Sequence, residues 1–236
     1  MKLQNKIQYS ICALVCWCFL PSAFGQVNMT LTGVNGNSYA GVYTSPYYAT
    51  VNGVSTTVIC DDFETESTIG ESWQANVNNV ASVVAGPTTI APKFTPTGNY
   101  DAVANLATQL LGISPSKSFT YNSNTTNLQV DLSFAIWEIF DPKGVSSYLG
   151  SSDSVYQASS YLASQALSQK YYAGEYSNVL IYTPTGCATG GSCVPQEFIS
   201  VSAPEGSSAA ILTADLIFFL PVVLLFRRRP GRTLGR

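Results

Sequence analysis

Long apolar runs at both ends of the chain restrict the part that can fold as a water-exposed domain. Near the N-terminus, two lysines precede an apolar run, and Ala23 and Gly25 are the small residues that signal peptidase requires. We predict a signal peptide over residues 1–25, cleaved before Gln26. The alternative is a lipoprotein signal that uses Cys16.

The second apolar run covers residues 209–226 and is 18 residues long. As a helix it would extend roughly 27 Å, which just spans the hydrocarbon core of a bilayer. All five arginines of the chain follow this run, beginning with Arg227, Arg228 and Arg229. Because basic residues gather on the cytoplasmic side of membrane helices, we predict a transmembrane helix with its tail in the cytoplasm.

The region between the two apolar runs is acidic. Residues 26–208 carry 13 acidic residues and four lysines, a net charge of -9, and no arginine. Such a surface cannot neutralise a phosphate backbone. Nucleic-acid binding is therefore excluded as a function class.

The segment before the second run contains the sequence SAPEGSS, in which Pro204 and Glu205 are followed by Gly206. A Pro-Glu motif, one hydrophobic helix and an immediate arginine cluster together resemble the PEP-CTERM sorting tail of Gram-negative bacteria. Gly206 stands where that family usually has a second proline. The resemblance implies that residues 203–236 are a sorting tail, processed by an exosortase-type membrane protease. It also implies delivery to the cell surface or the extracellular matrix.

Three of the six cysteines remain after removal of the signal peptide: Cys60, Cys187 and Cys193. Cys187 and Cys193 enclose a short glycine-containing loop between two strand-like runs, so we predict a disulfide at a hairpin tip. A metal clip is the alternative, but two thiolates need further ligands and the chain has no histidine. Cys60 is then the unpaired cysteine of an exported protein.

The pattern of apolar residues predicts a single α+β domain over residues 26–202. Asn52 and Gly53 form the strongest hairpin signal of the chain and join two strand-like runs, the second of which ends at Cys60. Helical spacing and capping residues then predict three helices, and two further strands close the domain. The helices are expected within residues 98–112, 126–142 and 152–172, and the closing strands within 178–184 and 196–202. We therefore expect a β-rich sandwich or barrel with a helical insertion.

The acidic residues after Cys60 bear on its chemistry. A thiol nucleophile needs a base, usually histidine, and neighbouring carboxylates raise a thiol pKa. We therefore do not expect catalysis by Cys60. Asp61, Asp62 and Glu64 are candidate calcium ligands, but no glycine-turned loop accompanies them, and solvated acids at a strand end are the simpler interpretation. No cofactor is expected.

A second resemblance involves Cys60 and the sequence AIW, which ends at Trp137. A strand-end cysteine, an acidic pair and a later helix with AIW resemble the thioester domain of bacterial surface proteins. In that family the cysteine is joined to a glutamine two residues before AIW. Ser133 occupies this position here and has no acyl carbon, while Gln129 lies one helical turn earlier on the same face. The resemblance implies a thioester-domain-like scaffold without the crosslink, or a covalent binder that uses Gln129.

These observations favour an exported, non-enzymatic protein of the cell surface or matrix, which acts through adhesion or association with exopolysaccharide. A surface protein is an alternative partner. One alternative function is a covalent adhesin with a Cys60 thioester. The other is a secreted carbohydrate-active enzyme, for which Glu138 and Asp141 offer two carboxylates on one helix face.

Overall fold

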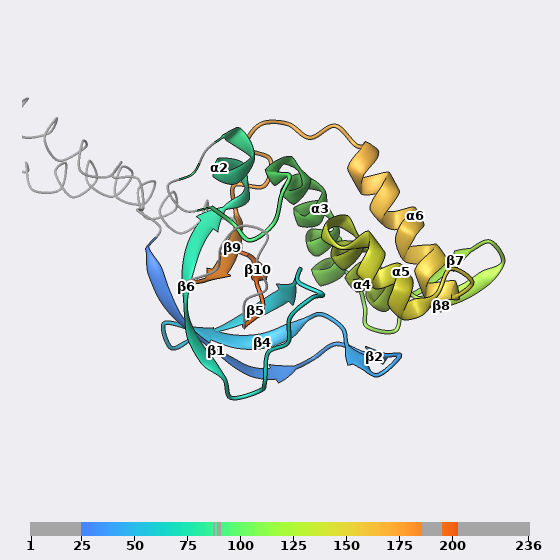
Figure 1. The fold of residues 1–236 in the computed structure, drawn as a ribbon, viewed down its shortest axis with the longest axis horizontal. Coiled ribbons are helices and arrows are strands. Elements are labelled where there is room, and N and C mark those ends of the chain that lie inside the picture. Colours follow the sequence, from blue (N-terminus) through green and yellow to red (C-terminus); the bar gives the residue numbers. More distant parts are fainter. Residues whose placement is uncertain (1–24, 87, 89–90, 186–194, 203–236) are drawn as a thin grey trace, which may run out of the picture.

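The computed structural model describes residues 25–86, 88, 91–185 and 195–202, and its centre is a closed six-stranded barrel (Figure 1). Every neighbouring pair of strands is antiparallel, in the order β1-β4-β5-β10-β9-β6, and β6 pairs with β1 to close the barrel. The strands are β1 (Gln26–Val34), β4 (Tyr47–Val51), β5 (Val54–Cys60), β6 (Ser72–Asn79), β9 (Val179–Pro184) and β10 (Phe198–Val201). A mixed fold built around a barrel is therefore confirmed.

The helices form one insertion in the chain, between β6 and β9, and α3 to α6 lie beside the barrel (Figure 1). They are α2 (Val80–Ala85), α3 (Tyr100–Gly112), α4 (Leu128–Phe140), α5 (Pro142–Leu149) and α6 (Ser154–Ser168), with a 3-10 turn η2 (Thr97–Asn99). Two small hairpins complete the fold: β2 (Ser38–Tyr39) with β3 (Val42–Tyr43), and β7 (Ser118–Tyr121) with β8 (Asn124–Asn127). All three predicted helices are present.

Local sequence signals explain where several elements begin and end. Asn52 and Gly53 have positive φ angles of 49° and 81°, as the two-residue turn between β4 and β5 requires. Asn127 caps α4 and Asp153 caps α6, each by accepting hydrogen bonds from two backbone amides. Pro142 follows the end of α4 and occupies the first turn of α5, where a missing N–H costs nothing.

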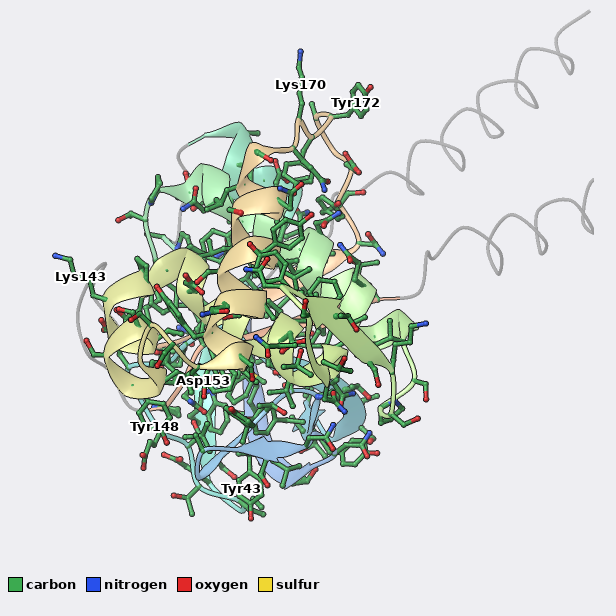
Figure 2. All side chains as sticks on the ribbon, turned by 90° about the vertical axis from the view of Figure 1, so that its right-hand side faces the viewer. Tyr43, Lys143, Tyr148, Asp153, Lys170 and Tyr172 are labelled. Carbon is green, nitrogen blue, oxygen red and sulfur yellow. The ribbon has the colours of Figure 1, made fainter. Side chains whose placement is uncertain are left out.

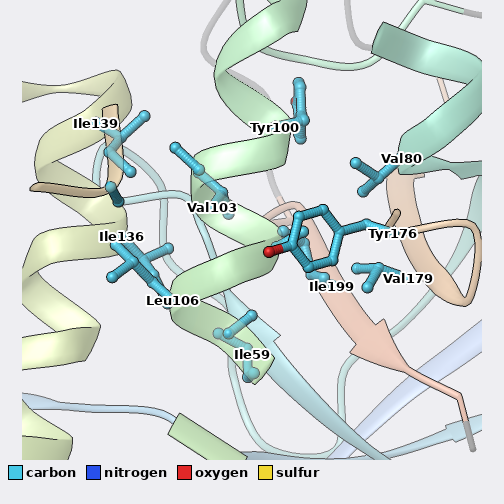
Figure 3. Packing of buried hydrophobic residues seen from close by; sticks show 14 of the residues in the cluster. Ile59, Val80, Tyr100, Val103, Leu106, Ile136, Ile139, Tyr176, Val179 and Ile199 are labelled. Carbon is cyan, nitrogen blue, oxygen red and sulfur yellow. The ribbon is translucent and has the colours of Figure 1, made fainter. Parts of the chain in front are cut away.

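Helix α4 is the central element of the insertion, because it packs against α3, α5, α6 and the barrel. Ten of its 13 residues are buried. On one side Ile136 and Ile139 belong to a core shared with α3, and Figure 3 shows them facing Val103 and Leu106. On the other side α4 contributes three side chains to the second core, which fills the barrel. These are Val130, Phe134 and Trp137.

Several predictions concern residues outside the described part of the chain. These are most of the signal peptide (1–25), the Cys187–Cys193 loop, and the sorting tail with its apolar run at 209–226. Among the residues that the structure describes, no helix has the length and apolar character needed to cross a membrane. The predictions for the termini stay predictions.

Candidate functional site

Cys60 is the last residue of β5 and is completely buried. Its backbone amide donates to Ser45 Oγ at 3.1 Å, and its thiol donates to the backbone oxygen of Asp62 at 3.1 Å. Burial raises the pKa of the thiol well above its usual value, and the charges of Asp62 and Asp61 raise it further. Cys60 is thus a buried thiol without a disulfide partner among the described residues, and it lies beside α4.

Asp62 is the centre of a buried polar cluster. Its Oδ1 accepts hydrogen bonds from the backbone amides of Glu64, at 3.1 Å, and Thr65, at 3.3 Å. Its Oδ2 accepts from the Thr65 hydroxyl and from the Glu197 amide, the latter at 3.3 Å. The same oxygen forms an ion pair with Lys93 Nζ, and both side chains are almost fully buried. Each oxygen of Asp62 thus has a separate set of donors.

Glu197 forms the second half of this cluster, which we call the buried ionic cluster (Asp61, Asp62, Lys93, Tyr100 and Glu197). Its Oε1 accepts from the Tyr100 hydroxyl at 2.5 Å. Its Oε2 accepts from the Lys93 backbone amide at 2.9 Å and from the Thr183 hydroxyl. Burial raises the Glu197 pKa, while these hydrogen bonds lower it. Polar groups of β9, of α3 and of the segment before α3 therefore meet at one carboxyl group.

Asp61 is the least satisfied member of the cluster. Both of its carboxyl oxygens are buried, and within the described residues neither makes a hydrogen bond of ordinary geometry. Burial raises the Asp61 pKa well above its usual value, and the charges of Glu197 and Asp62 raise it further. These effects favour the protonated, neutral form of Asp61.

A pocket of about 610 Å³ opens beside Cys60 and Asp62. The loop after β5 forms one wall, the β2–β3 hairpin and β1 form another, and α4 and α5 complete it. Five aromatic side chains line the pocket: Tyr43, Tyr47, Phe63, Trp137 and Tyr148. We call this cavity the aromatic pocket.

Exposure decreases from the rim of the aromatic pocket to its floor. Tyr43 is 59% exposed and Tyr148 is 45% exposed, whereas Trp137 is only 3% exposed. Phe63 connects the two levels, because its ring centroid lies 5.5 Å from that of Tyr148 and 5.2 Å from that of Trp137. Figure 2 shows Tyr43 and Tyr148 near the barrel, with Lys170 and Tyr172 at the opposite end of the molecule. The pocket thus offers two accessible rings above an apolar floor.

Hydrogen bonds hold the walls of the aromatic pocket in place. The Tyr148 hydroxyl donates to the Ala40 backbone oxygen at 2.6 Å, which ties α5 to the β2–β3 hairpin. Gln196 Nε2 donates to the backbone oxygens of Asp62, at 3.1 Å, and Thr65, at 2.6 Å. The loop after β5 is therefore tied to the start of β10, and the buried ionic cluster lies directly behind the pocket wall.

The residues of the thioester resemblance are only partly brought together. Trp137 lies next to Cys60, as the spacing implied. Ser133 is buried, and its hydroxyl donates to the Gln129 backbone oxygen at 2.9 Å. The Gln129 side chain accepts from Asn37 Nδ2 at 2.9 Å. The amide of Gln129 is thus engaged with the loop after β1.

The expectation that the acids after Cys60 are solvated is wrong for two of them. Asp61 and Asp62 are completely buried, whereas Glu64 and Glu66 are exposed. Asp62 is satisfied by Lys93 instead of an added cation. Within the described ranges, no group of three His, Cys, Asp or Glu side chains has a geometry that could hold a metal ion.

The carboxylates proposed for a glycosidase have local roles. Glu138 accepts hydrogen bonds from the hydroxyls of Ser159, at 3.2 Å, and Ser160, at 2.6 Å, on α6. Asp141 accepts from the Gly144 amide at 2.8 Å and caps α5. Neither residue lines the aromatic pocket.

Sequence reasoning missed Lys93 and Glu197, the two charged residues that meet Asp62. Lys93 lies in a proline-rich segment that the sequence predicts to be a loop, and Glu197 directly precedes a short apolar strand. One signal was available: a lone charged residue between apolar neighbours, in a chain with only 11% charged residues, is a candidate for burial as a pair. The partner could not be identified without the fold.

Comparisons with protein-family models, with curated proteins and with solved structures gave no match.

Proposed function

We propose that the chain is an exported, non-enzymatic protein of the cell surface or extracellular matrix that binds polysaccharide in the aromatic pocket. The observation that carries this proposal is the pair of accessible rings, Tyr43 and Tyr148, above the floor formed by Phe63 and Trp137. Aromatic faces pack against the C–H faces of sugar rings. A volume of about 610 Å³ falls in the usual range for ligand pockets.

The polar groups of the pocket suit the hydroxyl groups of a sugar. Ser67, Thr68 and Gln196 line the pocket together with Glu66, so donors and acceptors surround the aromatic wall. Among the residues that the structure describes, no lysine or arginine lines it. The region 26–208 has a net charge of -9, which would repel a polyanion. A neutral polysaccharide is therefore the class of ligand that fits.

Export and sorting are the second part of the proposal, and the termini support them. The predicted signal peptide over 1–25 would direct secretion, and the PEP-CTERM-like tail would recruit an exosortase-type protease through Pro204 and Glu205. The membrane would then be a transient location. The test is fractionation of cells of a Gram-negative host that has this protease. Surface or matrix localisation of the wild type is expected, and unchanged localisation after replacement of both residues by alanine would contradict it.

Affinity electrophoresis tests polysaccharide binding directly. The full chain is run through native gels that contain a soluble β-glucan, a dextran or a polyuronate. Retardation by a neutral polysaccharide is expected, and loss of it in Tyr43→Ala would place binding in the pocket. Tyr172→Ala is the matched control, because Tyr172 is 78% exposed and lies outside the pocket. Unretarded migration in all neutral gels, or equal retardation of the two variants, would contradict the proposal.

A further inference from the structure

Lys93 and Asp62 are buried in direct contact with each other, an arrangement that favours a covalent bond between their side chains. Their exposed fractions are 1% and 0%, and Lys93 Nζ is in direct contact with Asp62 Oδ2. Nζ also lies 5.3 Å from the centroid of the Phe94 ring. Removing an ammonium and a carboxylate from water costs several kcal/mol per ion, and this cost disappears if the two groups condense to a neutral amide.

The two oxygens of Asp62 are arranged as condensation requires. Oδ1 accepts hydrogen bonds from two backbone amides, those of Glu64 and Thr65. Such a pair of amides stabilises the negative charge that develops on a carbonyl oxygen under nucleophilic attack. Oδ2 faces the amine and accepts from the Thr65 hydroxyl. Oδ1 is therefore held where it can carry the negative charge of the intermediate, and Oδ2 is placed where it can become the leaving group.

We propose that Lys93 and Asp62 react with each other to form an intramolecular amide between Nζ and Cγ. The ammonium first passes a proton to Oδ2, giving a neutral amine and a carboxylic acid. The amine nitrogen then attacks Cγ, and Oδ1 carries the negative charge. As the Cγ–Oδ2 bond breaks, Oδ2 takes a second proton from the nitrogen and leaves as water. Three ammonium protons thus become one amide proton and the two protons of water, with no other reactant.

Neighbouring side chains assist the transfer of protons and fix the geometry. The Thr65 hydroxyl donates a hydrogen bond to Asp62 Oδ2, and its oxygen lies 3.4 Å from Lys93 Nζ. It can therefore carry the second proton from Nζ to Oδ2. Glu197 is a positioning residue: its carboxylate accepts from the Lys93 backbone amide, and its own amide donates to Asp62 Oδ2. Asp61 has no hydrogen-bond partner of ordinary geometry among the described residues, and burial together with the charges of Glu197 and Asp62 raises its pKa.

The amide would close a loop between residues that are 31 positions apart. It would tie the end of β5 to the segment before α3, and so the wall of the aromatic pocket to the helical insertion. This inference is independent of polysaccharide binding, because the reaction needs only the buried ionic cluster.

Mass spectrometry of the purified full chain tests the proposal. Proteolysis of the wild type should give a branched peptide that contains Lys93 and Asp62 and is lighter by one water than the two peptides together. Lys93→Arg keeps the cation but lacks the amine, so its intact mass should exceed that of the wild type by one water beyond the difference between the side chains. Asp62→Asn should give the same branched peptide with loss of ammonia instead of water.

Two experimental results would overturn the proposed amide. Separate, unmodified peptides from a folded wild type, with Lys93 open to acetylation after unfolding, would overturn the proposal. A mass deficit of one ammonia that maps to Cys60 and a glutamine, with Lys93 and Asp62 in separate unmodified peptides, would also overturn it, because the only linkage would then be a thioester. Circular dichroism of Lys93→Arg checks its fold. The wild-type peptide map decides the question even if this variant does not fold.

Discussion

Replacing Lys93 by methionine would remove the cation that contacts Asp62 while keeping most of the side-chain volume. The oxygens of Asp62 would keep their hydrogen bonds to Glu64, Thr65 and Glu197, but the charge would be buried without a counter-ion. Breaking a buried ion pair in this way typically costs about 3–5 kcal/mol. If the amide is present, the variant also loses a cross-link across 31 positions, which chain-entropy estimates value at roughly 3–4 kcal/mol.

Urea unfolding of the full chain, followed by circular dichroism, measures this cost. We expect Lys93→Met to lower the free energy of unfolding by at least about 3 kcal/mol at neutral pH. A second change, Asp62→Asn, should recover part of the loss, because the asparagine Oδ1 still accepts from the Glu64 and Thr65 amides and carries no charge. A cost below about 1 kcal/mol for Lys93→Met, the range of an exposed pair, would refute the reasoning. So would the absence of any recovery in the double variant.

Three further predictions follow from burial and close contact. Because burial raises the pKa of Cys60, iodoacetamide should modify this thiol only after unfolding, and rapid alkylation in the native protein would contradict its placement. Burial raises the pKa of Asp131 to about 7, against about 3.9 in an unfolded chain. The folded state therefore binds the Asp131 proton more tightly than the unfolded chain does. The resulting contribution to the free energy of unfolding is complete below about pH 4 and is lost as the pH rises through about 7. Urea unfolding between about pH 4 and about pH 7 should show a smaller loss in the free energy of unfolding for Asp131→Asn than for the wild type. The same pH dependence in both proteins would contradict this prediction. A Cβ on Gly36 would lie 1.7 Å from the Thr44 backbone oxygen, so Gly36→Ala should cost about 1–3 kcal/mol in urea unfolding, whereas Gly98→Ala, with open space around it, should not.

The fold was predictable where local chemistry decides the structure. The Asn52-Gly53 turn, the Asp153 cap and the apolar spacing of α3 are short-range signals, and each element appears where they indicate. Helix α3 ends at Gly112, the last residue of its predicted range. Closure of the barrel was not predictable. It depends on pairing between β1 and β6, which are distant in the sequence and have no shared local signal.

The candidate site was predictable only around Cys60 and Trp137. Their proximity followed from a strand end and a helix motif, and both side chains are buried as expected. The burial of Asp61 and Asp62 was missed, because acidic residues after a strand are normally solvated. The cation that satisfies Asp62 comes from a segment 31 positions away, and Glu197 lies 135 positions away. Only the fold brings these three segments together.

The central claim is that the aromatic pocket binds a neutral polysaccharide, and titration calorimetry with an oligosaccharide of the retained polysaccharide tests it most directly. Loss of one contacting ring should cost roughly 1–2 kcal/mol, about 5- to 30-fold in Kd. We predict this weakening for Tyr43→Ala and for Tyr148→Ala, a loss of measurable binding when both are changed, and an unchanged Kd for Tyr172→Ala. Equal affinity of the wild type and the double variant would contradict the account.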